Sequence, residues 1–163
     1  MTGIKRLSRI AMLVAVAMTL AWLESALGFD VGVPGLKIGY ANAVCLFTLY
    51  RYGTSDAFAV NISRVVLMAL LFGNAFSVLY SISGALCSFG VMWLLKKTKL
   101  FGICGVSIAA ACTHNMAQLA TAAVVGGTAY VFSYAPPLLI GGTVFGAVVG
   151  AVCAIILKRI PEN

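Results

Sequence analysis

The stretch "GICGVSIAAACTHNMAQLATAAVVGG", residues 102–127, decides the class of fold. It contains no Asp, Glu, Lys or Arg, and a helix of this length can cross the roughly 30 Å of hydrocarbon in a bilayer. It nevertheless holds the only histidine of the chain, His114, beside Asn115 and one helical turn before Gln118. The sequence therefore predicts a transmembrane helix that carries a polar cluster.

The composition extends this prediction to the whole chain. Of the 163 residues, 62% are hydrophobic and only 9% are charged, whereas a soluble domain usually has about 25% charged residues. Charge-poor stretches follow one another at residues 10–27, 38–53, 57–72, 75–95, 102–127 and 135–157. We expect an all-α membrane protein in which a six-transmembrane-helix bundle forms a single integral membrane domain over residues 1–163.

The basic residues predict the orientation of this bundle. Nine of the eleven Lys and Arg residues lie at the N-terminus, in alternate loops or at the C-terminus: Lys5, Arg6, Arg9, Arg51, Lys96, Lys97, Lys99, Lys158 and Arg159. Because cytoplasmic segments carry an excess of Lys and Arg, both termini are expected in the cytoplasm. The net charge of +7 is then mainly a topology signal. It does not predict binding to nucleic acid, which requires a solvated basic face.

Ionisable side chains within the predicted spans indicate a functional site. Arg64 lies inside stretch 57–72, and a central arginine costs about 2.5–3.5 kcal/mol on the membrane-insertion scale, so it must face protein or water. His114 and Gln118 share one face of their helix. At about 1.5 Å per residue, Glu24 lies roughly 20 Å and His114 roughly 18 Å from the cytoplasmic edge. Both therefore fall in the outer half of the membrane.

We predict from these depths a substrate pocket that opens to the outer side. The candidate substrate-binding residues are Glu24, Lys37, Asn42, Arg64, His114 and Gln118. The alternative is that the polar groups only form hydrogen-bonding pairs between helices, and we favour that interpretation for Asn61, Asn74 and Asn115. An ion pair between Glu24 and Arg64 would be compatible with either interpretation. The five cysteines lie in apolar spans without a C-x-x-C pair, so we expect no disulfide and no metal site.

Small residues repeat along two of the predicted helices. Gly142, Gly146 and Gly150 are spaced four residues apart, and this spacing predicts close packing against another helix of the bundle. Ala11 and Ala15 have the same spacing near the cytoplasmic end of the first helix. For them the pattern leaves open a second interpretation, which is docking to a partner within the membrane.

Three segments carry a resemblance to a known family. They are "PGLKIGYANAVCLFTLYRYG" (34–53), "RVVLMALLFGNAFSVLYSISGALCSFGVMWLLKK" (64–97) and "GVSIAAACTHNMAQL" (105–119). With their P-G-x-K-x-G-x-A-N and H-N-x-x-Q elements, they resemble the bacterial Gx transporters, a family often labelled heptaprenyl diphosphate synthase component I. That family is similar to the substrate-binding S components of energy-coupling factor (ECF) transporters.

The resemblance implies a fold, a set of partners and a location. It implies the six-helix fold of an ECF S component in the bacterial cell membrane, with Ala11 and Ala15 in the motif that docks on the transmembrane T component. Two ATPase subunits would complete the assembly. Lys37 and Asn42 match the first family element, and His114, Asn115 and Gln118 match the second. Ala117 stands where the family often has a glycine.

The acidic residues bear on whether the chain is an enzyme. Elongation of a prenyl chain needs clustered carboxylates that hold magnesium against a diphosphate. The four acids are Glu24, Asp30, Asp56 and Glu162, and no two of them are close in the sequence. We therefore expect no catalytic residues, no cofactor and no metal, in a membrane subunit that captures a small solute for uptake. The alternatives are a non-catalytic membrane partner in prenyl diphosphate or quinone biosynthesis, and a proton-coupled secondary carrier with His114 as the relay.

Overall fold

The computed structural model describes residues 3–26, 39–72 and 75–160, and this part of the chain contains helices and no strands. The helices are α1 (Gly3–Ala26), α2 (Tyr40–Arg51), α3 (Thr54–Phe72), α4 (Ala75–Thr98), α5 (Ile103–Gly126) and α6 (Ala135–Arg159), with a short 3₁₀ helix η1 (Ala129–Tyr134) before α6. The predictions of an all-α fold and of six helices are confirmed. Five of them are long and apolar enough to cross a membrane, which indicates a multi-pass membrane protein.

Helix α2 is the exception to the prediction of six spanning helices. It has 12 residues, which extend about 18 Å and cannot cross the hydrocarbon layer alone. Glycines bound it at both ends: Gly39 has a φ of 81° before its first turn, and Gly53 has a φ of 97° after its last. A left-handed backbone is readily adopted by glycine and ends a regular helix. Within the predicted run, the described residues therefore form the short, largely buried helix Tyr40–Arg51.

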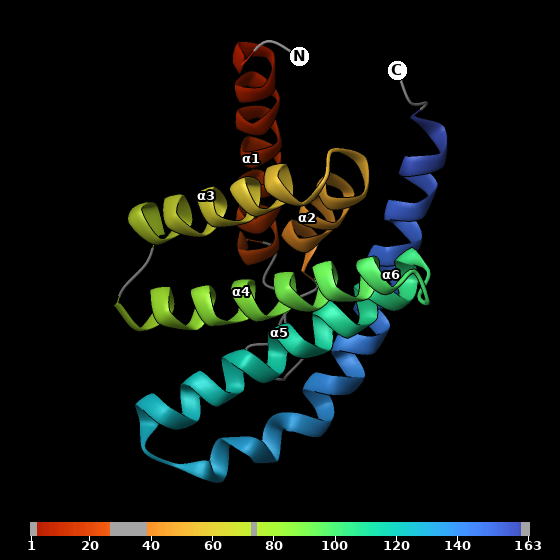
Figure 1. Cartoon of the computed structure of the whole chain (residues 1–163). Coiled ribbons are helices and arrows are strands. Elements are labelled where there is room, and N and C mark those ends of the chain that lie inside the picture. Colours follow the sequence, from red (N-terminus) through yellow and green to blue (C-terminus); the bar gives the residue numbers. More distant parts are fainter. Residues whose placement is uncertain (1–2, 27–38, 73–74, 161–163) are drawn as a thin grey trace.

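The helices form two groups that meet at α2. In Figure 1, α5 packs against both α4 and α6 in the lower part of the view, while α1 and α3 lie with α2 in the upper part. Helix α2 contacts α1 and α3 as well as α4 and α6. The start of α1 and the end of α6 both lie at the top of the view. Helix α2 therefore joins the two groups, which are also in contact through α3 and α4.

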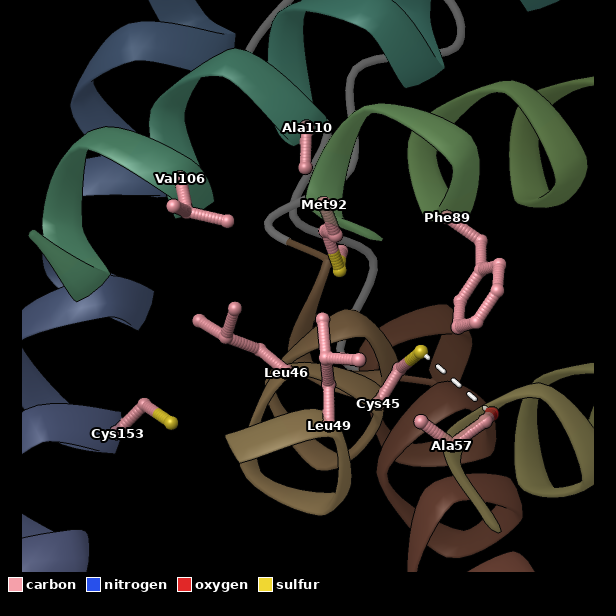
Figure 2. Close-up of a cluster of buried hydrophobic side chains, with 9 residues drawn as sticks. All are labelled: Cys45, Leu46, Leu49, Ala57, Phe89, Met92, Val106, Ala110 and Cys153. Carbon is pink, nitrogen blue, oxygen red and sulfur yellow. Dashed lines mark hydrogen bonds between the residues drawn. The ribbon is translucent and has the colours of Figure 1, made fainter. Parts of the chain in front are cut away.

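The buried side chains of α2 explain this central position. Val44 packs with α1 and α3 residues in one apolar cluster. Cys45, Leu46 and Leu49 belong to a second cluster with side chains from α3, α4, α5 and α6, and Figure 2 shows these side chains pointing toward one another. Leu46 and Leu49 have no exposed surface. Because α2 is apolar on several faces, it is stable only when it is surrounded by other helices.

The glycines of α6 pack against α5, as their spacing predicts. A Cβ atom added at Gly150 would lie 2.7 Å from Cys104 Cα, and one added at Gly146 would lie 2.8 Å from Ile108 Cα. Both contacts are to backbone atoms of α5, which cannot move without moving the helix. Small residues of this kind let two membrane helices approach closely.

Polar contacts gather at the end of the molecule where α1 begins. Arg6 Nε donates to Asp56 Oδ1 over 2.7 Å, and Arg9 forms a second ion pair with the same carboxylate. The Arg9 guanidinium also lies 4.0 Å from the centre of the Tyr52 ring. These contacts fix the start of α1 to the start of α3. The cytoplasmic location of this end remains a prediction from the charge pattern.

The α5–α6 contact generates a stability prediction. Gly150→Ala should destabilise the protein by about 1–3 kcal/mol, because the new methyl group overpacks a helix–helix contact. Gly90→Ala is the matched control, since a Cβ at Gly90 meets nothing within 4 Å. It should be neutral or stabilising, because alanine favours helix over glycine. Melting temperatures of both variants in detergent would test this, and equal values would contradict the close contact.

Candidate functional site

A cavity of about 120 Å³ lies where all six helices meet. Each helix contributes to its wall. The lining includes Glu24, Gly39, Asn42, Arg64, Ser81, Ser107, His114, Asn115 and Gln118. Polar groups facing a shared space between helices are unusual in a membrane protein, because each of them loses its contact with water. The cavity is therefore the candidate functional site.

The structure brings together five of the six side chains that the sequence predicted as substrate-binding: Glu24, Asn42, Arg64, His114 and Gln118. They come from α1, α2, α3 and α5. The sixth, Lys37, lies outside the described residues, as does Asn74. The presence of the five side chains in one cavity agrees with the similar membrane depths that the sequence predicts for Glu24 and His114. A role of these residues in binding remains a prediction.

Glu24 is held by the start of α2. Its Oε1 accepts a hydrogen bond of 2.7 Å from the backbone N–H of Gly39, and only 8% of the residue is exposed. The residue just before a helix donates from the positive end of the helix dipole, which stabilises a carboxylate. Part of the Glu24 charge is thus compensated by the backbone of α2.

Arg64 is positioned by Asn61, one turn earlier on α3. Its Nη2 donates to Asn61 Oδ1 over 3.1 Å, while Asn61 Nδ2 donates to the carbonyl of Ala85 on α4 over 3.0 Å. Asn61 is 2% exposed, so the interpretation of this residue as a contact between helices is supported by its geometry. In the described part of the chain, Arg64 Nε is buried without a hydrogen bond.

The hypothetical ion pair between Glu24 and Arg64 does not form. The ion pairs among the described residues are those of Asp56 with Arg6 and Arg9. Glu24 is instead turned to the backbone of Gly39, and Arg64 to a neutral amide. The two opposite charges both line the cavity without touching.

His114 and Gln118 of α5 pack against Gly84 of α4. A Cβ atom added at Gly84 of α4 would come within 2.8 Å of His114 Cε1 and 2.9 Å of Gln118 Cγ. The missing side chain of Gly84 is therefore what leaves room for both residues. His114 Nδ1 also lies 3.4 Å from Ser88 Oγ, and this contact orients the ring.

Gln118 differs from the other buried amides. It is only 5% exposed and lines the cavity, yet its side chain forms no hydrogen bond with any described residue. A buried amide without partners costs free energy unless water or a ligand satisfies it. Gln118 is thus a buried polar group that faces the space where a ligand would lie.

Asn115 holds α5 to α6, as the sequence predicts for a side chain about 100° around the helix from His114. Its Nδ2 donates to the carbonyl of Leu138 over 2.9 Å. It also lines the cavity, which the sequence did not indicate. The amide therefore connects two helices at the edge of the site.

Sequence reasoning missed the contribution of α4. Ser81 lines the cavity, and Gly84 packs directly against His114 and Gln118. The signal was present in the spacing of Ser81, Gly84 and Ser88, which places small and polar residues on one face of the helix. Apolar neighbours on every side obscured it.

The predicted docking residues lie on the surface. Ala11 and Ala15 are exposed, and Ser8 and Thr19 continue the same face of α1 toward either end. Ala17, on the opposite side, is fully buried. A small-residue face of α1 is therefore uncovered in the chain by itself.

The contrast between Asn115 and Gln118 generates a prediction that needs no ligand. Asn115→Leu should lower the free energy of unfolding by about 0.5–1.5 kcal/mol, because it removes a hydrogen bond between helices. Gln118→Met, of similar length, should leave it unchanged or raise it, because no protein partner is lost. Melting temperatures of the two ligand-free variants and of the original protein would test this difference in stability. An equally early melt of Gln118→Met would assign Gln118 a structural role.

Comparison with known proteins places the chain in a family. The family described as heptaprenyl diphosphate synthase component I matches residues 13–156, which include all five described residues of the cavity predicted from the sequence. Searches of curated proteins and of solved structures found no match. Because the match covers most of the chain, from α1 to α6, the protein belongs to the heptaprenyl diphosphate synthase component I family.

Proposed function

We propose that this chain is the substrate-binding membrane subunit of an ECF-type uptake transporter in the bacterial cell membrane. It captures a small solute from the outer side and performs no chemical reaction on it. A transmembrane T component and two ATPase subunits supply the energy. The observation that carries this proposal is the cavity, which gathers polar groups from all six helices.

The position of the cavity supports capture from the outer side. Arg6 and Glu24 lie near opposite ends of α1, roughly 27 Å apart at about 1.5 Å per residue. Arg6 belongs to the basic end that the charge pattern assigns to the cytoplasm. Glu24 lines the cavity. A ligand bound beside Glu24 is therefore nearer the outer surface than the cytoplasm.

The carboxylates support a role without catalysis. Prenyl transfer needs several carboxylates that hold magnesium ions against a diphosphate. Of the two acids in the described residues, Glu24 accepts from Gly39, and Asp56 is paired with Arg6 and Arg9. Each is engaged in holding helices together, and they belong to different ends of the molecule.

The exposed face of α1 supports docking to a membrane partner. Helices in a bilayer associate through small residues that allow close backbone contact. Ala11 and Ala15 offer such a face, and the chain's own helices do not cover it. The ion pairs of Arg6 and Arg9 with Asp56 hold the opposite side of α1 against α3. The small-residue face is thus kept pointing outward.

A second candidate is favoured by the description of the family. A non-catalytic membrane partner of a prenyl synthase would also have an exposed docking face and no catalytic acids. It would have no need for a polar cavity lined by all six helices. The two candidates differ in whether the chain takes up a solute.

Docking through α1 generates the first prediction of this function. Ala15→Trp should abolish co-purification with the T component and ATPases, because an indole cannot fit a close helix contact. Binding of solute should remain, since Ala15 does not line the cavity. Ala151→Trp, an equally exposed alanine on α6, is the matched control and should retain the partners. Retention of the ATPases by Ala15→Trp would contradict docking at this face.

Energy coupling generates the second prediction. Uptake into proteoliposomes should require ATP and the partner ATPases, and a proton uncoupler should not reduce it while ATP is held constant. Uptake by the purified chain alone, driven by a pH gradient, would instead identify a secondary carrier. Prenyl synthesis that depends on the chain, without any uptake, would favour the second candidate.

A further inference from the structure

The volume of the cavity limits the size of its ligand. At about 120 Å³, it is slightly smaller than an engineered protein cavity of about 150 Å³ that binds benzene. A ligand that fills it has about six non-hydrogen atoms by this comparison. A long prenyl chain or a nucleotide is several times larger. The site is therefore built for a small molecule.

The charges of the wall differ in how well they are compensated. Among the described lining residues, Glu24 is the one Asp or Glu, and Arg64 is the one Lys or Arg. Glu24 already accepts a hydrogen bond from Gly39 at the positive end of α2. Arg64 donates only to the neutral oxygen of Asn61, and its Nε has no acceptor within the described chain. Glu24 is near enough to attract Arg64 electrostatically, but in the described residues the guanidinium has no hydrogen-bonded anionic partner.

An arginine in this state selects a particular partner. The guanidinium group is planar, remains protonated and can donate two parallel hydrogen bonds to a carboxylate. An uncompensated buried charge is costly, and a carboxylate that pairs with it removes this cost. A neutral amide of the same shape can supply one acceptor but no charge.

Other residues of the cavity lining provide hydrogen-bonding groups. Gln118, buried and without a protein partner, presents both a donor and an acceptor to the cavity. Ser81 and Ser107 line the same space with hydroxyl groups. A polar substituent on the ligand would be satisfied there.

We infer that the cavity binds a small organic carboxylate of about benzene size, with its carboxylate at Arg64 and its remaining atoms toward Gln118. This inference deepens the proposed function and rests on it, since it names the class of solute that the subunit captures. It assigns Arg64 to charge selection and Gln118 to recognition of the rest of the molecule.

The test compares three molecules of nearly the same shape and different charge. Butyrate, butyramide and n-butylamine are titrated into the full chain, purified in detergent, and affinity is measured by calorimetry. Butyrate should bind about tenfold or more tightly than butyramide, because only the acid forms a charged pair with Arg64. n-Butylamine should bind least. Farnesyl diphosphate, which is anionic but has a long chain, should not compete with butyrate.

Variants assign the selectivity to the named residues. Arg64→Gln should remove the preference for butyrate over butyramide, and Arg64→Lys should keep a weaker preference because the charge remains. Glu24→Gln, which keeps an acceptor for Gly39, should bind butyrate more tightly than the original protein, because it removes the negative charge from the cavity wall. Gln118→Met should weaken binding of 4-hydroxybutyrate, whose hydroxyl group can pair with Gln118, more than binding of butyrate, which has no such group. Circular dichroism checks that each variant remains helical.

Several results would overturn the inference. They are equal binding of the acid and the amide, preference for n-butylamine, absence of binding by all three, and competition by farnesyl diphosphate. The comparison of the three ligands on the original protein tests the preference for a carboxylate even if Arg64→Gln fails to fold. Failure here is distinct from failure of the transport proposal. If n-butylamine binds best and uptake still requires the ATPases, the proposed preference for a carboxylate is wrong, whereas the proposed transport function is retained.

Discussion

Arg64 carries a charge inside a bundle of largely apolar helices, and contacts of α3 and α4 hold it in place. A polar group in the membrane interior must be satisfied by protein, by water or by a ligand. Asn61 binds both the guanidinium and the carbonyl of Ala85, so the arginine is held between α3 and α4. Arg64 also lines a cavity in which the carboxylate of Glu24 is turned to the backbone of Gly39.

The space around Arg64 exists because neighbouring helices are packed closely at some positions and kept apart at others. Gly146 and Gly150 bring α6 onto the backbone of α5. Gly84 removes a side chain from α4 at the level of His114 and Gln118. Helix α2 fills the centre with Leu46 and Leu49, and its first turn ends at the cavity with Asn42. Close packing at Gly146 and Gly150, together with the missing side chain of Gly84, thus leaves a polar space where the helices meet.

The sequence predicted those features that a single helix encodes, and it failed where neighbouring helices decide. Six helices, the glycine ridge of α6 and the shared depth of Glu24 and His114 follow from hydropathy, spacing and the rise per residue. The length of α2 could not be predicted, because the run 38–53 is mostly apolar up to Arg51 and the ends of the helix depend on two left-handed glycines. The choice of Gly39 rather than Arg64 as the partner of Glu24 depends on where α2 begins in space.

The central claim is that the cavity holds a ligand and that its polar lining serves more than the packing of helices. Native mass spectrometry of the full chain, purified gently from cells, tests this most directly. The account predicts one small anionic molecule bound to the original protein and lost from Gln118→Ala, while Asn115→Ala, which breaks a helix contact, retains it. An original protein without any bound small molecule, or a prenyl lipid bound equally by both variants, would contradict the account.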